Sequence, residues 1–409
     1  MDAIVDRVAG IDVGQASVVV TVIVGGPHER PRKETRTFHT MTRDLLELRE
    51  WLASLGVTQV GMEATGVYWK PIHAVLEDGF DVIVGNAHHI SNVPGRKTDV
   101  KDSEWLANLV RHGLIARSFV PPASIRMLRD LLRFRRKLVE SRTSERNRVV
   151  KLLEIGNIKL SSVATDVFGV SGMLMLRALA EGQATPAEMA ELAKGQLRKK
   201  LESLALCLQG ALQEHHRFLL RLQLRRLDFL AADLETLDSR IDDALTPYLP
   251  QLDALQAIPG ISAIAAATVI AEMGVDMTVF RDARHLSAWA GLAPGNDESG
   301  GKKRNARVRQ GNVYLKTILV EAAWASSRTK GTYFCDKFHR LRNRRGARRA
   351  AVAIAHKILI AAHAVLSGKT YRELGGGYLD SLHRRQTLKN LTRRIERLGF
   401  DVRVTPKAA

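Results

Sequence analysis

Three short runs near the N-terminus are rich in the β-branched residues Val, Ile and Thr, a pattern that predicts β-strands. The runs cover Arg7–Val13, Ser17–Val24 and residues 34–39. A leucine stripe with helical spacing then runs from Thr42 to Gly56, which predicts a helix. Strand and helix patterns alternate further on: strand 59–62, helix 67–77, strand 81–84 and a helix from 99–102 to about 112. We therefore expect an α/β domain over residues 1–120.

The middle of the chain carries long, leucine-rich and highly charged stretches without internal turn residues, at residues 124–155 and 187–246. Apolar positions in the second stretch approximate a heptad seam, the repeat found in coiled coils. The seam comprises Leu201, Leu204, Leu208, His215, Leu219, Leu222, Phe229, Leu237, Ile241 and Leu245. We expect a helical hairpin or coiled coil over residues 121–250, with residues 157–185 at its tip and a place for subunits to associate.

Residues 251–375 are predicted to form a mainly α-helical domain. The sequence IPGIS at residues 258–262 precedes a helix of small residues, which is typical of a helix-hairpin-helix element. Its turn at Gly260 can expose backbone N–H groups to a DNA phosphate, although the same turn also occurs in ordinary protein cores. A glycine-rich basic loop follows, and then helices around residues 313–327, 333–343 and 347–366. Residues 376–409 form a basic tail.

The charge balance narrows the class of partner. The chain has 62 Lys and Arg against 43 Asp and Glu, a formal charge of +19 and a pI of about 10.2. Such a protein suits a polyanion, and nucleic acid is the leading candidate. Ribosome-associated and membrane-surface proteins are equally basic, so charge alone does not decide between them. Aromatic residues make up only 5%, so we expect contacts to the phosphate backbone to dominate over base stacking.

Three further features indicate a cytoplasmic protein. Cys207 and Cys335 lie far apart without zinc-ligand spacing, so neither a disulfide framework nor a zinc site is expected. Acidic residues precede any apolar run at the N-terminus, unlike a secretory signal. Charged or histidine residues interrupt the apolar stretches 257–275 and 350–366, which predicts buried helices and no membrane partner.

Four carboxylates are candidates for metal chemistry: Asp12, Glu63, Asp99 and Asp102. Asp12 is expected to be buried in the middle of a strand, where an unpaired charge is costly, so a cation should face it. Two strand ends and one helix face can supply the oxygen ligands for two Mg²⁺ (or Mn²⁺) ions about 3.5–4 Å apart, which stabilise an in-line phosphoryl displacement. Asp99 and Asp102 could instead serve only as an N-cap and a helix-dipole partner, which leaves Asp12 and Glu63 unexplained.

Two other sequence features were weighed for chemistry. The GIDVG sequence at residues 10–14 is similar to the phosphate loop of sugar kinases and actin-like ATPases, but the second Asp-x-Gly loop and the adenosine motif of that class are not found. Ser299 precedes two glycines and the cations Lys302, Lys303 and Arg304, the setting that a nucleophilic hydroxyl attacking a phosphate needs. The alternative is a solvated basic loop whose serine only hydrogen-bonds a phosphate.

Two sets of motifs resemble a known family. In the N-terminal part these are GIDV at 10–13, GMEATG at 61–66 and KTDVKD at 97–102. In the C-terminal part they are IPGI at 258–261, AGLAP at 290–294, SGGK at 299–302 and GNxxLK at 311–316. Together they resemble the DEDD transposases of the insertion-sequence family numbered 110, including its 1111 subgroup. The likeness covers about residues 7–375.

The resemblance implies a ribonuclease-H-like (Holliday-resolvase-like) N-terminal domain, a coiled coil and a C-terminal transposase domain. In that family four acids bind Mg²⁺ and a C-terminal serine attacks DNA, forming a covalent phosphoserine intermediate. By motif these residues are Asp12, Glu63, Asp99, Asp102 and Ser299. Some members are guided by a structured RNA transcribed from the element's flank. One departure from the family is the acidic stretch 295–298 directly before the serine.

The sequence as a whole predicts a metal-dependent DNA recombinase that acts as a homo-oligomer, because strand exchange requires more than one active site. We expect nucleic-acid contacts at Lys97, Gly260, Lys302, Lys303 and Arg304. A hydrolytic nuclease of the same fold, with water in place of the serine, is the first alternative. A catalytically inactive nucleic-acid-binding descendant is the second, and the intact set of four acids argues against it.

Overall fold

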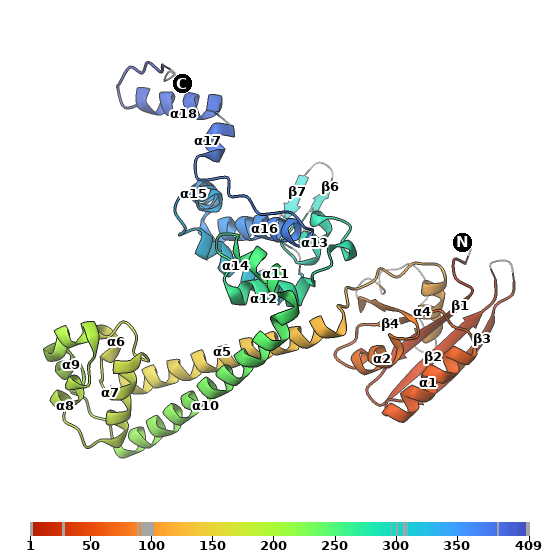
Figure 1. Ribbon diagram of the computed structural model, residues 1–409, viewed down its shortest axis with the longest axis horizontal. Coiled ribbons are helices and arrows are strands. Elements are labelled where there is room, and N and C mark those ends of the chain that lie inside the picture. Colours follow the sequence, from red (N-terminus) through yellow and green to blue (C-terminus); the bar gives the residue numbers. More distant parts are fainter. Residues whose placement is uncertain are drawn as a thin grey trace. The chain divides into compact units, whose positions relative to one another are not determined.

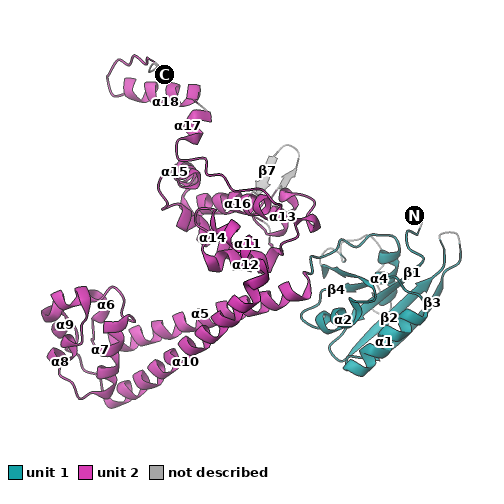
Figure 2. Cartoon of the chain, in the orientation of Figure 1, with its two compact units in different colours: residues 1–120 teal, residues 121–409 magenta. Residues whose placement is uncertain are grey.

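The computed structural model describes residues 3–26, 29–87, 90, 102–295, 297–299, 302–305, 308, 310–382 and 384–405. For residues 297–299 and 302–305 the description covers the backbone only. The chain divides into two compact units, Met1–Val120 and Pro121–Ala409, drawn in teal and magenta in Figure 2. A mixed sheet dominates the first unit and helices dominate the second, which is the predicted α/β plus α layout.

The first unit is built on a five-stranded sheet with the order β3-β2-β1-β4-β5. Its strands are β1 (Arg7–Val13), β2 (Ser17–Val24), β3 (Arg32–His39), β4 (Gln59–Glu63) and β5 (Asp81–Gly85). The first three strands form an antiparallel meander, and β4 and β5 continue the sheet parallel to β1. The five predicted strands are therefore confirmed.

Helices cover both faces of this sheet (Figure 1). On one face α1 (Thr42–Ser54) and α2 (Trp69–Leu76) bury their apolar stripes against alternate residues of β1, β2 and β4. On the other face α4 (Asp102–Arg111) packs through Ala107 and Val110. Residues of β1 consequently point by turns to α1 and to α4, as the two-residue repeat of a strand requires.

In the second unit two long helices, α5 (Ala123–Ile155) and α10 (Glu214–Leu245), run side by side (Figure 1). Six residues of α10 with heptad spacing are buried: Leu220, Leu224, Leu227, Leu234, Ile241 and Leu245. The predicted seam is wrong at Leu219, Leu222 and Phe229, which are 42%, 37% and 64% exposed, and at His215, which is exposed as well. The chain breaks between residues 207 and 214, so the helical phase of α9 (Leu201–Cys207) does not carry over into α10.

A small helical subdomain, here called the tip, separates the two long helices. It contains α6 (Leu160–Val163), α7 (Val170–Glu181), α8 (Pro186–Glu191), a 3₁₀ turn (Gly195–Lys200) and α9. Its apolar core also includes buried residues from the adjoining ends of α5 and α10. The prediction of one unbroken helix over residues 187–246 is wrong. Thr185 and Glu188 form a capping box that starts α8, and Gly195, with φ +58°, interrupts the helix further on.

The C-terminal helices confirm most of the predicted elements. They begin with a 3₁₀ turn (Thr246–Tyr248), α11 (Leu249–Gln256), α12 (Ala263–Met273), a second 3₁₀ turn (Met277–Val279) and α13 (Ala283–Trp289). A hairpin of β6 (Asp297–Ser299) and β7 (Lys302–Asn305) follows. The chain ends with α14 (Val313–Ser326), α15 (Tyr333–Arg345), α16 (Ala347–Leu366), α17 (Tyr378–Leu382) and α18 (Arg384–Glu396).

One of these helices, α16, is long and apolar enough to cross a membrane by length and composition alone, but it is partly buried within the second unit. Its buried residues face α13, α14 and α15, as in the core helix of a helical domain (Figure 1). No residue of α18 is buried.

Candidate functional site

Helix α4 lies in close contact with the sheet at two glycines. A Cβ atom on Gly10 would lie 2.2 Å from the backbone N of Ala107 and 2.2 Å from the backbone O of Ser103. A Cβ on Gly61 would lie 2.3 Å from a methyl carbon of Val110. Gly10 and Gly61 are neighbours in the register of β1 and β4. Because neither glycine has a side chain, the backbone of α4 can pack directly against β1 and β4 here.

Strand alternation places two of the predicted acids on the same side of the sheet as α4. Asp12 lies two residues after Gly10, and Glu63 lies two residues after Gly61, so both share the face of those glycines. Both positions are at the carboxyl ends of adjacent parallel strands. Asp102 is the first residue of α4, directly before the Ser103 carbonyl that lies over Gly10. Three of the four predicted acids therefore belong to one face and one end of this sheet.

A buried hydroxyl pair fixes the start of α4. The hydroxyls of Thr21 and Ser103 lie 2.8 Å apart, and Thr21 also pairs with the hydroxyl of Thr35 at 2.9 Å. Thr21 is opposite Gly10 in the β1–β2 ladder, so this contact is made on the α4 face. The position of Asp102 along the sheet is thus set by its neighbour Ser103.

The surroundings of the acids differ from the prediction in one respect. Asp12 is exposed, whereas we expected it to be buried in the middle of its strand. Asp12 lies near the end of β1, and its neighbours Ile11 and Val13, which point to the opposite face of the sheet, are buried. Glu63 and Asp102 are half-buried, and Glu63 accepts a hydrogen bond of 3.2 Å from the hydroxyl of Thr65.

The described acids do not lie close enough together to form a complete metal site. Among the residues that the structure describes, no group of three or more His, Cys, Asp or Glu side chains lies close enough to hold a metal ion. Asp99 and Lys97 lie outside the described residues. Carboxylate oxygens remain the donor type that Mg²⁺ and Mn²⁺ prefer, so the chemistry of the face fits a divalent metal.

The predicted nucleophile is carried by a hairpin in the second unit. Ser299 is the last residue of β6 and pairs with Lys302, the first residue of β7, which leaves only two glycines between them in the sequence. Lys303 and Arg304 also belong to β7. An isolated bridge between Pro294 and Val308 continues the pairing below the hairpin. The structure therefore places the serine and the three cations in one short hairpin and describes their backbone only.

Gly260 lies in the turn between α11 and α12, as the helix-hairpin-helix prediction requires. Its φ is +94°, and a Cβ there would lie 2.3 Å from the carbonyl O of Ala322 and 2.8 Å from the backbone N of Ser326. The glycine is therefore needed for contact with α14. Its predicted role as a phosphate contact stays a prediction.

The basic clusters differ in how many internal partners they have. Around residues 133–137, Arg133 pairs with Glu272, Arg135 with Asp238, and Arg136 and Lys137 with Glu140. These cations are largely neutralised within the fold. Five arginines around the α15–α16 junction are exposed: Arg342, Arg344, Arg345, Arg348 and Arg349.

The comparisons with known proteins agree with the motifs. Residues 9–157 match the DEDD family described as transposase, and residues 252–339 match the family described as transposase IS116/IS110/IS902. A probable family 20 transposase of Pseudomonas aeruginosa is 28% identical over 334 residues, which are 79% of this chain and 88% of the relative. The transposase for insertion sequence element IS1111A of Coxiella burnetii is 35% identical over 130 residues, 28% of this chain and 35% of the relative.

Two parts of the chain thus match transposase families, in the order in which the motifs occur. The DEDD family implies the use of a divalent metal. This chain belongs to the IS110 family of insertion-sequence transposases, which are enzymes that act on DNA.

Proposed function

We propose that this transposase cuts and rejoins DNA with acids from the first unit and a serine from the second. The observation that carries the proposal is that Asp12, Glu63 and Asp102 share the α4 face of the sheet, at the carboxyl ends of β1 and β4. The order β3-β2-β1-β4-β5, with three antiparallel strands followed by two parallel ones, supports a ribonuclease-H-like domain over residues 1–120. Asp99 would complete the set of four acids.

A divalent metal, Mg²⁺ or Mn²⁺, would supply charge stabilisation for both oxygens of an in-line phosphoryl displacement. The three described acids would hold and orient it through their carboxylate oxygens. Lys302, Lys303 and Arg304 would neutralise the DNA phosphate near the hairpin. Lys97 and the turn at Gly260 are the further nucleic-acid contacts that we propose.

In the first chemical step the Ser299 hydroxyl oxygen attacks a DNA phosphorus. A phosphoserine ester forms, one backbone P–O bond breaks, and the released DNA oxygen leaves as a hydroxyl after it has taken a proton. The serine proton passes to a carboxylate or to water. In the second step a hydroxyl of another strand attacks the ester, which rejoins DNA and restores the serine. No nucleotide cofactor is consumed, because each ester bond broken is replaced by another.

The remaining regions take supporting roles in this proposal. Residues 121–250 form the coiled-coil region through which subunits associate as a homo-oligomer, residues 251–375 form the transposase domain, and residues 376–409 form a basic tail that binds nucleic acid. The reaction would take place in the cytoplasm, where the DNA is. A structured guide RNA is a further partner of some family members, and binding of RNA from the flank of the element tests it here.

The variant Ser299→Ala tests the proposal most directly. We expect DNA binding and metal binding to persist, while the covalent adduct in a denaturing gel and the recombinant product both disappear. Ser239→Ala, at an exposed serine on α10, is the matched control and should form the adduct at the normal rate. Cutting by Ser299→Ala at the wild-type rate would instead make water the nucleophile and favour a hydrolytic, resolvase-like nuclease. Absence of any metal-dependent nicking by the wild-type protein would favour an inactive nucleic-acid-binding descendant.

A further inference from the structure

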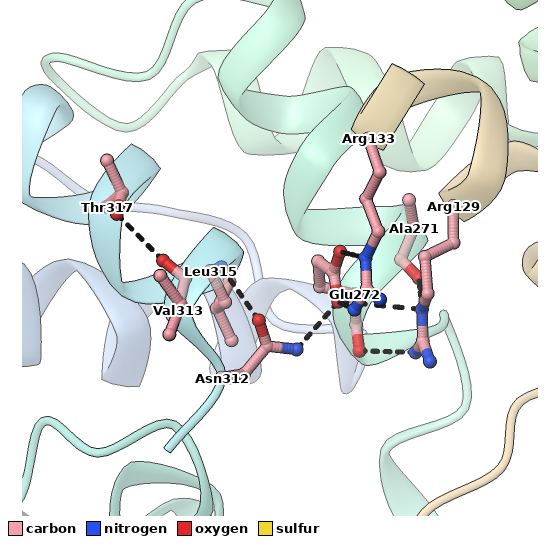
Figure 3. Close-up of polar contacts among 8 residues, drawn as sticks. All are labelled: Arg129, Arg133, Ala271, Glu272, Asn312, Val313, Leu315 and Thr317. Carbon is pink, nitrogen blue, oxygen red and sulfur yellow. Dashed lines mark hydrogen bonds and ion pairs between the residues drawn. The ribbon is translucent and has the colours of Figure 1, made fainter. Parts of the chain in front are cut away.

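A single buried carboxylate joins three elements of the second unit (Figure 3). Glu272, near the end of α12, is 1% exposed. The guanidinium group of Arg133, from α5, donates two hydrogen bonds of 2.8 Å, one to each carboxylate oxygen. The side-chain amide of Asn312, directly before α14, donates a third, of 2.6 Å, to Oε2. Glu272 is the single charged residue of the apolar helix α12, and a lone charge in such a helix was the feature in the sequence that could have indicated this cluster.

Arg129, one turn before Arg133 on α5, holds the end of α12 as well. It donates hydrogen bonds to the carbonyl oxygens of Ala271 (3.0 Å) and Glu272 (2.9 Å), and its Nε lies 3.5 Å from the Glu272 carboxylate. A cation suits the last carbonyls of a helix. Burial lowers the pKa of Arg129, whereas the hydrogen bond and charge of Glu272 outweigh burial and raise the pKa of Arg133. Both guanidinium groups stay charged at neutral pH.

Asn312 uses both ends of its amide. Its side-chain oxygen accepts a hydrogen bond of 3.0 Å from the backbone N–H of Leu315 and so caps α14, while its NH₂ group binds Glu272. An N-cap alone could be a serine or an aspartate. The bond to Glu272 requires a donor that reaches farther, which the amide supplies.

The segment from Gly291 to Asn312 carries Ser299, and its two ends are in contact. A Cβ on Gly311 would lie 2.3 Å from the backbone N of Gly291, so the exit of the loop lies directly on its entrance. The bridge between Pro294 and Val308 lies along the chain between this contact and the β6–β7 hairpin. The hairpin therefore rises from a closed base, and Asn312 fastens that base to Glu272 and, through it, to α5.

We propose that Asn312, Glu272 and Arg133 form a positioning site that fixes the base of the Ser299 hairpin to α5 and so holds the serine in place for attack on DNA. The proposal rests on the proposed role of Ser299. A buried ion pair is rarely more stable than an apolar replacement, but its geometry is far more specific. Directional hydrogen bonds to one carboxylate keep the base of the hairpin in a single position on α12. Apolar side chains in their place would let the base shift.

Asn312→Asp tests the positioning site because it keeps the size and the helix cap but turns the donor into a second carboxylate facing Glu272. We expect the single-turnover rate of adduct formation to fall about 100-fold, the scale of a 1 Å misplacement, with DNA affinity within about two-fold of wild type. Amide hydrogen exchange in residues 292–311 should be faster. Asn312→Ser, which keeps a capping oxygen but cannot reach Glu272 and adds no charge, should slow adduct formation as well.

Thr317→Ala is the matched control. Thr317 lies on the same helix, and its hydroxyl donates a hydrogen bond of 2.8 Å to the carbonyl oxygen of Val313, away from Glu272 (Figure 3). Adduct formation and loop exchange should both stay at wild-type levels in this variant, which shows that a change elsewhere on α14 is tolerated.

The outcomes separate this inference from the proposed function. A wild-type adduct rate in Asn312→Asp, with Ser299→Ala inactive, overturns the positioning site and leaves the nucleophile in place. A wild-type adduct rate in Asn312→Ser also overturns it. If Ser299→Ala cuts DNA at the wild-type rate, the nucleophile is wrong, and hydrogen exchange in residues 292–311 then decides alone whether Asn312 anchors the loop. Unchanged exchange in Asn312→Asp overturns the anchor in that case.

Discussion

Gly10→Ala should displace the helix that carries Asp102 from the sheet. The added Cβ would lie 2.2 Å from two backbone atoms of α4, where ordinary contact begins at 3.4 Å, so the helix has to move by about 1 Å. No flexible side chain can yield, because both obstructing atoms are backbone. We expect a loss at the upper end of the range for overpacked cores, about 3 kcal/mol in the free energy of unfolding of the first unit.

Native-state hydrogen exchange, read by mass spectrometry on peptides from β1 and β4, measures this loss in the full chain. Peptides from the tip should be unchanged and serve as an internal reference. Gly79→Ala is the matched control, because a Cβ there meets nothing within 4 Å. It should change the free energy by no more than about 0.5 kcal/mol. Equal protection in the two variants would refute the close seating of α4.

Three further predictions concern metal, salt and pH. Asp12→Asn, Glu63→Gln and Asp102→Asn should each abolish cleavage without changing the metal-free melting curve, and retained recombination in two of the three would remove the metal-site assignment. DNA affinity should fall steeply as salt rises from low to physiological levels, because the exposed cations contact phosphates, and a flat dependence would contradict this. Burial, with Lys357 nearby, lowers the pKa of His356. The neutral form is therefore favoured in the fold, so the melting temperature should fall as pH drops below about 6.5, less steeply in His356→Gln.

Local sequence patterns predicted the first unit well. The β-rich run at residues 7–13 gives the strand β1, whereas the side of the sheet on which Asp12 lies becomes known only from the packing of α4 over Gly10. The burial of Asp12 could not be obtained in the same way, since it depends on how far the covering helix extends over the strand end.

The second unit shows where such patterns fail. The heptad spacing of α10 is visible in the sequence, but its phase depends on where the helix begins after the tip, and a shift of one residue turns the stripe by about 100°. Leu219 and Phe229 are exposed for this reason. The bond between Glu272 and Asn312 joins residues 40 apart in sequence, and no short-range pattern encodes such a pair.

The tip has a consequence for how this chain can change in evolution. Its two ends meet where α5 stops, since the backbone N–H of Ala211 donates to the carbonyl oxygen of Gly156 and that of Lys159 donates to the carbonyl oxygen of Cys207. Its apolar core is largely its own. A segment that enters and leaves a fold at one point can be gained, lost or exchanged as a unit. Residues 157–210 are thus a module that can vary in size and surface among relatives while the long helices on either side keep their register.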